Sequence, residues 1–142
     1  MKNFFPRRIL TANERSIVPE AFFQLFLERL KVSFFPSRKY LPAARMDKNI
    51  SPAPGKIESV KTVASVINGL SPRTPWSSTC LVKVLAAHKM LARRRIPHIL
   101  HFGVQINQSK EIKAHAWLSV ADETIIGAEN LHLYKEISRI HF

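Results

Sequence analysis

The chain has little of several residue types, and each scarcity excludes a class of protein. One cysteine in 142 residues rules out an internal disulfide, so a reducing cytoplasm is the expected compartment. A lone cysteine also argues against structural zinc, and no histidine spacing indicates a metal site. The four glycines form no phosphate-binding loop of the kind found in nucleotide-binding proteins. We therefore expect neither a metal nor a cofactor.

Long apolar runs are missing as well. The most apolar stretch, Ala21 to Leu30, is interrupted by Gln24, Glu28 and Arg29, which makes it too short and too charged to span a bilayer. The basic start of the chain lacks the apolar centre and the small-residue cleavage site of a secretory signal. Both observations agree with a cytoplasmic protein.

Acidic residues are few. Ten Asp and Glu stand against 22 Lys and Arg, and the formal net charge is +12. This excess implies an acidic partner, which can be an acidic peptide, an anionic membrane surface or a nucleic acid. The basic residues are spread over both halves, and only two tyrosines and two tryptophans are present for base stacking. We therefore do not expect nucleic acid as the partner, whereas contact with an anionic membrane surface stays compatible with the charge.

The N-terminal part of the chain is rich in phenylalanine and is predicted to be helical. Thr11 to Glu14 have the spacing of a capping box, and Pro19 either begins a helix or kinks one already started. Apolar residues at helical spacing continue to Val32. Seven of the nine phenylalanines lie in the first 35 residues. This region therefore needs a cover, either the rest of the protein or a docked partner.

The whole sequence predicts an α+β fold in a single domain, 1–142. Residues 51–55 are typical of a linker between a helical N-terminal region, 1–50, and a core at 57–142. In the core, two segments of helical period are followed by three of period two. The predicted helices span 57–69 and 79–91, and the predicted strands, an antiparallel meander, span 98–106, 112–120 and 124–128.

Cys80 and His115 are the candidates for chemistry. Cys80 shares a stripe of its predicted helix with Val84 and Ala87, so the thiol faces the protein body from the first turn. The unpaired N–H groups and the positive pole at a helix start favour a thiolate. His115 lies within a predicted strand, on the face that also carries Trp117. A cysteine that opens a helix, followed by a histidine on a later strand, is the chain order of papain-like and transglutaminase-like enzymes.

Four motifs, in this order, resemble one family. They are Pro75–Leu81 (PWSSTCL), Leu91–Pro97 (LARRRIP), Gly103–Val104 and Ala114–Leu118 (AHAWL). Together with the helical segment before them, they are similar to the lasso-peptide leader peptidases. These are transglutaminase-like cysteine peptidases, often encoded as the stand-alone half of a split maturation protein. The resemblance covers residues 10 to 140 and implies a transglutaminase-like or papain-like core, with the cysteine helix packed on a small antiparallel sheet.

The resemblance also implies an activity, the removal of the leader from a ribosomally made lasso-peptide precursor. Cys80 would be the nucleophile, His115 the general base and later the general acid, and the Cys80 N–H group the oxyanion donor. The implied partners are the precursor leader, a small leader-recognition protein that presents it, and the synthetase-like enzyme that closes the macrolactam ring.

The third catalytic residue is where this chain departs from the family pattern. The family usually has an acidic residue near the end of the strand that follows the histidine strand, and this chain has Ile125–Ala128 there. If three residues join the two strands, His115 pairs with Glu129; if two residues join them, it pairs with Asn130. Glu129 is our preferred orienter of His115, and Asn130 is the alternative. Asp122 is interpreted as a turn residue, and a Cys–His pair without an orienter also stays open.

Two interpretations compete with the peptidase. The missing acidic residue fits a catalytically silent scaffold that keeps the transglutaminase-like fold. The charge fits a basic module that binds nucleic acid or a membrane. A single cysteine is often no more than a buried, inert thiol, and a histidine inside a strand is often only a packed residue. The setting of Cys80 and His115 in the quoted motifs is what favours the enzyme.

Overall fold

The computed structural model describes residues 10–36 and 54–142. The predicted helical region 1–50 is therefore described in part, and the predicted linker at 51–55 lies mostly outside the described residues. No helix within the described ranges has the length and apolar character needed to cross a bilayer.

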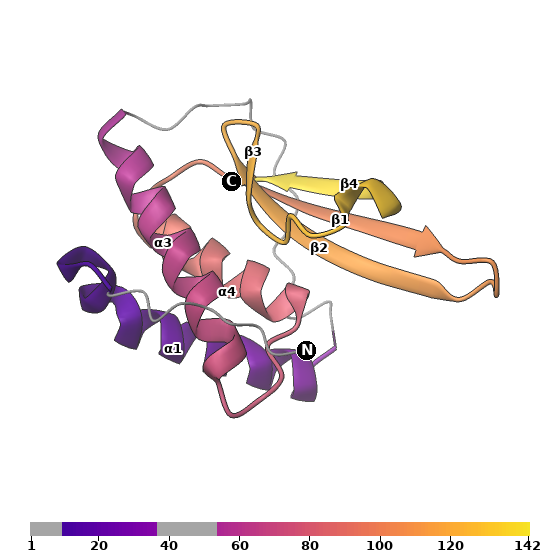
Figure 1. The fold of residues 1–142 in the computed structure, drawn as a ribbon, viewed down its shortest axis with the longest axis horizontal. Coiled ribbons are helices and arrows are strands. Elements are labelled where there is room, and N and C mark those ends of the chain that lie inside the picture. The colour runs from indigo at the N-terminus through magenta and orange to yellow at the C-terminus, as the bar shows by residue number, and fades with distance from the viewer. Residues whose placement is uncertain (1–9, 37–53) are drawn as a thin grey trace.

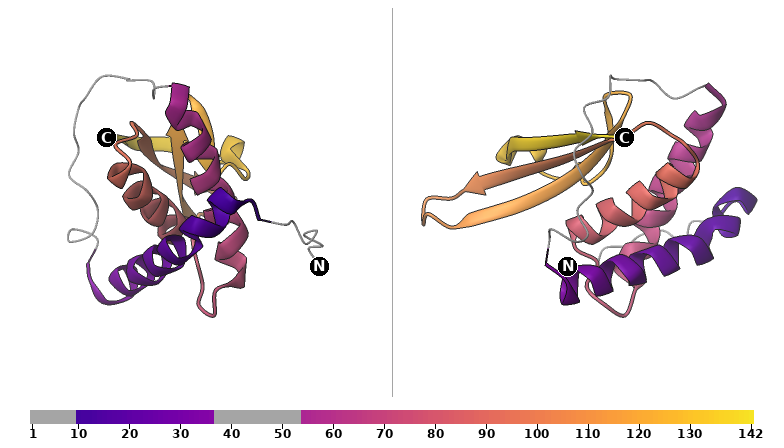
Figure 2. Two further views of the ribbon diagram at one scale, coloured as in Figure 1. Left: turned by 90° about the vertical axis from the view of Figure 1, so that its left-hand side faces the viewer. Right: turned by 180° about the vertical axis from the view of Figure 1, so that it is seen from behind.

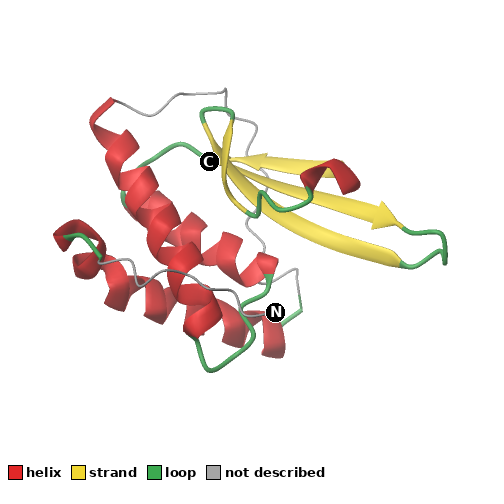
Figure 3. Ribbon diagram, in the orientation of Figure 1, coloured by secondary structure: helices red, strands yellow, loops and turns green. Residues whose placement is uncertain are grey.

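Helices and strands form two separate layers, as the secondary-structure colouring makes clear (Figure 3). The helices are α1 (Ala12–Phe34), α3 (Ile57–Leu70) and α4 (Cys80–Arg93). The strands are β1 (Ile99–Ile106), β2 (Ile112–Val120), β3 (Glu123–Ile126) and β4 (Lys135–His141). Short 3-10 turns lie at Pro54–Lys56, Ser71–Arg73 and Leu131–Leu133. This arrangement confirms the predicted α+β class.

Helix α1 is one continuous helix that runs through Pro19. Its start has the predicted capping box, in which the Thr11 hydroxyl accepts from the Glu14 N–H and the Glu14 carboxylate accepts from the Thr11 N–H. The same buried carboxylate also accepts from the Ser65 hydroxyl of α3 at 2.6 Å. The capping box therefore fixes the helix start and joins α1 to α3.

An ion pair and a lysine hold the far end of α4. Arg94 donates from both terminal nitrogens to the Glu20 carboxylate of α1, at 3.0 and 2.7 Å. This fork-to-fork geometry is the strongest form of an arginine–carboxylate pair. The Lys56 ammonium donates to the carbonyls of Arg94 and Arg95, at 3.0 and 2.8 Å, where the helix leaves carbonyls unpaired. The basic run after α4 is therefore partly structural.

The four strands form one antiparallel sheet in the order β3-β2-β1-β4. The hairpin of β1 and β2 extends beyond the helix layer in Figure 1 and in the right-hand view of Figure 2. Strand β4 is not among the strands that the sequence predicts. It pairs with the outer edge of β1, with a bulge between Phe102 and Gly103. Because β3 and β4 lie at opposite edges, the connection between them, residues 127–134, must cross the sheet, so the sheet is not a simple meander.

The turn between β2 and β3 differs from both predicted connections. Val120 pairs with Glu123, so the turn has two residues, Ala121 and Asp122. The sequence predicts the connection at 121–123 or at 122–123 instead. Both turn residues have positive φ, 49° and 66°, which is the conformation of the tight hairpin turn that matches strand twist. The turn role predicted for Asp122 is confirmed, and the predicted registers are wrong at the turn.

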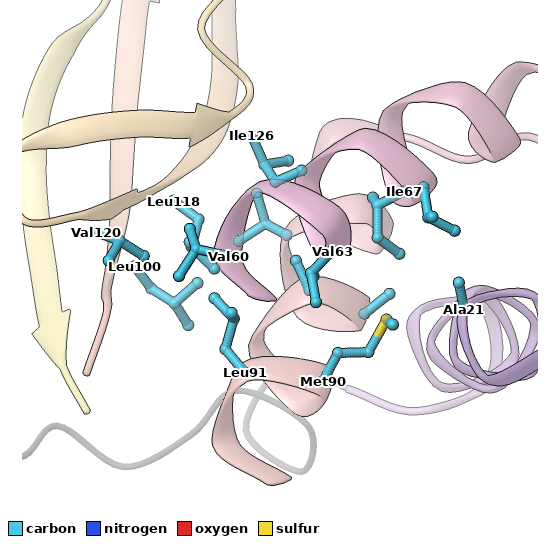
Figure 4. Packing of buried hydrophobic residues seen from close by; sticks show 14 of the residues in the cluster. Ala21, Val60, Val63, Ile67, Met90, Leu91, Leu100, Leu118, Val120 and Ile126 are labelled. Atoms are coloured by element: carbon cyan, nitrogen blue, oxygen red, sulfur yellow. The ribbon is translucent and has the colours of Figure 1, made fainter. Parts of the chain in front are cut away.

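The hydrophobic core lies between the helices and one face of the sheet (Figure 4). Leu100 of β1 and Leu118 of β2 point from the sheet toward Leu91 of α4 and Val63 of α3. Burying a leucine side chain of this kind contributes about 1.5–3 kcal/mol. Since side chains alternate along a strand, the residues between these core positions lie on the other face of the sheet.

Two buried histidines connect α4 to the first residues of the sheet. His88 Nδ1 lies 2.8 Å from His98 Nε2, and His98 Nδ1 lies 2.7 Å from the Ile96 carbonyl oxygen. The carbonyl only accepts, so His98 carries its proton on Nδ1 and its Nε2 accepts from His88. The Phe142 ring packs on both imidazoles, with centroids 4.4 and 5.3 Å away. The hydrogen bond requires at least one ring to be neutral, and burial favours the neutral form of both.

We predict that stability falls on mild acidification. Burial, assisted by the neighbouring His98 and Lys89, lowers the pKa of His88 to about 3, and burial also lowers the pKa of His98. The unfolded chain takes up these protons near its ordinary value of about 6.5, whereas the folded chain resists uptake, so stability is lost as pH falls below that value. His88 alone should cost about 2 kcal/mol at pH 5 relative to pH 7.5.

Chemical denaturation at the two pH values measures this loss. His88→Gln, which keeps a donor but does not titrate, should give a shallower pH dependence. His132→Gln, at an exposed histidine, should leave the dependence as it is in the unaltered chain. Equal unfolding free energies at pH 7.5 and pH 5 would contradict the neutral pair.

Candidate active site

Cys80 is the first residue of α4, as the sequence predicted. The rest of the predicted stripe is buried, whereas the cysteine is half-buried and remains a free thiol. The residue before it, Thr79, is the N-cap and has extended backbone angles. Its side chain makes no capping hydrogen bond, so the first-turn N–H groups are not occupied by the cap. The thiol thus lies at a helix start that has no side-chain cap.

The hydroxyl group of Thr74 makes the polar contacts within the loop that precedes α4. Thr74 Oγ1 donates within the loop and lies 2.9 Å from the Ser71 carbonyl, 3.0 Å from the Trp76 carbonyl and 2.9 Å from Ser78 Oγ. Trp76 in turn packs against Phe22 and Phe26 of α1, at centroid distances of 5.1 and 5.4 Å. The loop that delivers Cys80 is therefore anchored to α1.

His115 is half-buried on β2 and has one defined hydrogen bond. Its Nε2 lies 2.8 Å from the Gly127 carbonyl oxygen. Because that oxygen only accepts, Nε2 carries a proton, and in the neutral ring the lone pair is then on Nδ1. This is the tautomer that a general base requires when its second nitrogen is held by an acceptor. The orienter of His115 in this structure is thus a main-chain carbonyl.

The carbonyl of Gly127 can approach His115 because glycine has no Cβ atom and tolerates the backbone conformation required at this position. Its φ is 78°, in the left-handed region that favours glycine. A Cβ atom at this position would lie 2.6 Å from the Ala116 carbonyl oxygen and 3.1 Å from two atoms of Trp117. Strand β3 ends one residue earlier, at Ile126. The backbone therefore turns tightly against β2, and this turn aims the Gly127 carbonyl at the histidine.

The predicted orienters lie elsewhere. Glu129 and Asn130 are both exposed, and no hydrogen bond from either to His115 is present within the described ranges. The reason is the register: pairing between β2 and β3 shifts at a bulge beside Leu118 and stops at Ile126, before it reaches either residue. The predicted Glu129–His115 contact is therefore replaced by the Gly127 carbonyl in this structure.

Cys80 and His115 lie on α4 and β2, which pack against each other, but the two side chains are not in hydrogen-bond contact. Helix α4 packs against β2. Ala116 and Leu118 belong to the core that β2 shares with α4, so His115, which alternates with them, lies on the other face of the strand. Both candidate residues are described, and no hydrogen bond between the thiol and the imidazole is present. The candidate site thus consists of two separate halves.

A second histidine network on the same face was not predicted. His101 Nε2 lies 2.7 Å from Ser119 Oγ, and His101 Nδ1 lies 3.0 Å from a Glu136 carboxylate oxygen, whose other oxygen pairs with Arg139. Burial lowers the pKa of His101, although Glu136 opposes this. Burial raises the pKa of Glu136, but Arg139 and His101 outweigh it and lower that pKa overall. In the hairpin of β1 and β2, His101 lies opposite Trp117 and diagonal to Ser119, whereas Glu136 could be placed only with β4 known.

The order Ser119–His101–Glu136 is that of a hydrolytic triad, but its setting is structural. Ser119 and His101 are both buried, at 5% and 7% exposure, which leaves no room for a substrate carbonyl at the hydroxyl. Within the described residues, no group of three metal-ligating side chains is present either. The network instead connects β2, β1 and β4 on the face that carries His115.

Comparison with known proteins supports one family. A family model described as the transglutaminase-like superfamily matches residues 26–139, which include Cys80, His115 and Gly127. No curated protein and no solved structure matches the chain.

We predict that Gly127→Ala destabilises the chain and removes the hydrogen bond between His115 Nε2 and the main-chain carbonyl at 127. The added methyl group must displace main-chain atoms of β2 and must occupy a left-handed conformation, so we expect a loss of at least about 2 kcal/mol. Gly69→Ala is the matched control, because Gly69 is exposed on α3 and no atom of a neighbouring element lies within 4 Å of the position that its methyl group would take.

The control should stabilise the chain by about 0.5–1 kcal/mol, as alanine does in a helix. Thermal unfolding compares the two variants, and the nitrogen chemical shifts of the His115 ring report whether Nε2 keeps its proton. A Gly127→Ala variant with unchanged stability and an unchanged ring spectrum would contradict the described turn.

Proposed function

Because the chain belongs to the transglutaminase-like superfamily, we propose that it is a cysteine peptidase that removes the leader from a ribosomally made lasso-peptide precursor. The superfamily includes cysteine peptidases. The observation that supports the proposal most is the state of His115, whose Nε2 donates to the Gly127 carbonyl and whose Nδ1 is left as a base. The second support is the free thiol at the start of α4, which has no side-chain cap.

In the proposed reaction, His115 Nδ1 takes the proton of Cys80, and the thiolate attacks the scissile carbonyl carbon. The N–H group of Cys80 donates to the developing oxyanion, an interaction worth about 3–4 kcal/mol when the geometry is good. The imidazolium then protonates the leaving amine, and an acyl-enzyme remains. Water, deprotonated by the same histidine, releases the leader as a free acid and restores the thiol.

The two halves of the site must meet before this chemistry can begin. In the free chain His115 lies on the face of β2 that does not pack on α4. We therefore propose that binding of the precursor, or of the protein that presents it, shifts β2 and the start of α4 so that the thiol and Nδ1 come into hydrogen-bond reach. Catalytic contacts are commonly long or unformed in free enzymes and tighten in the complex.

The proposed partners follow from the resemblance and from charge. They are the precursor leader, a small leader-recognition protein and the macrolactam-forming synthetase, all in the cytoplasm where the precursor is made. A chain with a net charge of +12 attracts acidic peptides at long range. Contact with an anionic membrane surface would draw on the same charge.

A catalytically silent scaffold is the second candidate, and one observation favours it. Cys80 and His115 are not hydrogen-bonded, and the carbonyl that holds His115 carries no full negative charge to stabilise an imidazolium. On this alternative the fold serves to bind the precursor or a partner without cutting it.

Precursor cleavage, followed by mass spectrometry with the leader-recognition protein present, tests the first proposal. Cys80→Ala and His115→Gln should each lower the rate by about 10³-fold or more, because both remove groups that act in the transition state. His132→Gln, at an exposed histidine, should cleave at the unaltered rate. A wild-type chain that binds the precursor but cleaves it no faster than Cys80→Ala would establish the silent scaffold instead.

The orienter can be tested separately. If the Gly127 carbonyl holds His115 during turnover, Glu129→Gln and Asn130→Ala should each change kcat by less than about threefold. A kcat lowered by about tenfold or more in Glu129→Gln, with KM unchanged, would mean that Glu129 moves to His115 in the complex. The same result in Asn130→Ala would identify a Cys–His–Asn site.

If the basic charge of the chain attracts the leader, the binding affinity should depend on salt concentration. Affinity for the leader or its carrier protein should fall clearly when NaCl is raised from about 50 to 200 mM, since exposed charges are screened over about 8–10 Å in this range. Titration calorimetry at the two concentrations measures the change. Affinity that does not respond to salt would assign recognition to the exposed apolar surface of α1.

A further inference from the structure

Trp117 packs against two histidines on the sheet face that carries His115. Its ring is parallel to that of His101, with centroids 5.3 Å apart and an interplanar angle of 2°. It also stacks with His115, with centroids 6.0 Å apart and an angle of 25°. Tyr134, from the connection that crosses the sheet, completes the row at 4.8 Å from His115. His115 is therefore in contact with two aromatic rings.

A glycine makes room for this row. Gly103 of β1 is the cross-strand partner of His115, so no side chain stands opposite the histidine. The Trp117 ring fills the space from the diagonal position, which is within reach of a large aromatic side chain. A Cβ atom on Gly103 would lie 2.8 and 2.9 Å from two ring carbons of Trp117. The ring thus rests directly on the glycine backbone.

The His101 ring, on which Trp117 stacks, is held in place by hydrogen bonds. His101 is bonded at both ring nitrogens, to Ser119 of β2 and to Glu136 of β4. An imidazole held at both ends cannot rotate, so the surface that it offers to Trp117 is rigid. Trp117 is buried, at 7% exposure, yet it is outside the core that the sheet shares with the helices. Trp117 therefore packs on the sheet face that carries His101 and His115, and not in the core.

We propose that Trp117 is a positioning residue for His115: seated on Gly103 and backed by the bonded His101 ring, it fixes the plane of the His115 imidazole so that Nε2 meets the Gly127 carbonyl and Nδ1 is left free. This inference rests on the proposed peptidase function for its catalytic consequence. The placement of the ring itself is independent of that function.

The placement is tested by the tautomer of His115, read from the nitrogen chemical shifts of its ring. The unaltered chain and Trp117→Phe, which keeps an aromatic surface, should show one dominant tautomer with the proton on Nε2. Trp117→Leu should show a mixture. Trp76→Phe is the matched control at the chain's other tryptophan, which packs on Phe22 and Phe26, and should leave the ring spectrum unchanged.

Gly103→Ala supplies a second measurement that keeps both rings and serves if Trp117→Leu does not fold. The added methyl group displaces the Trp117 ring, so the His115 spectrum should shift toward the mixture seen with leucine. A single Nε2–H tautomer in folded Trp117→Leu, or in folded Gly103→Ala with displaced Trp117 signals, would overturn the proposal.

The catalytic consequence is measured on precursor cleavage. Trp117→Leu should lower kcat by about 10- to 100-fold, the cost of a misplaced catalytic group, with KM changed by less than about threefold. Trp117→Phe should recover most of the rate. An effect on KM alone would overturn the positioning role. If the unaltered chain does not cleave the precursor, the peptidase proposal fails, while the tautomer measurement still decides the placement of Trp117.

Discussion

The alternation of side chains along β2 is the constraint on which the rest of the structure depends. Every second residue, from Ala116 to Val120, enters the core that the sheet shares with α4 and α3. The residues between them form a separate polar and aromatic layer on the other face, with His115, Trp117 and Ser119. One strand thus anchors the fold and carries the candidate base. Any shift of its register by one residue would exchange the two layers.

This division explains why the free chain has a well-defined histidine and a well-defined cysteine but no hydrogen bond between them. The cysteine belongs to the helix layer, since it opens α4. The histidine belongs to the outer layer, where the Gly127 carbonyl and two aromatic rings hold it. Each half is ordered by its own neighbours. A movement of one layer against the other would therefore change the separation of the thiol and the imidazole.

Local patterns predicted much of this arrangement. The start of α4 at Cys80 and the two faces of β2 follow from helical and strand periodicity, which depends only on near neighbours in the chain. The turn at Ala121 and Asp122 was not predicted, because alanine rarely adopts a positive φ angle, and the bulge that follows depends on tertiary contacts. The orienter was missed for a different reason. A search for side chains cannot find a main-chain carbonyl, and only the close approach of Gly127 to β2 reveals it.

The tight turn at Gly127 also limits how the chain can evolve. In the family that the sequence resembles, an acidic side chain near this point orients the histidine. Any residue with a Cβ atom at 127 would bring that atom to 2.6 Å from the Ala116 carbonyl oxygen. A change to aspartate at 127 would therefore disturb the backbone turn whose carbonyl now holds His115. A side-chain orienter at position 127 would thus require that the connection after β3 be lengthened or moved.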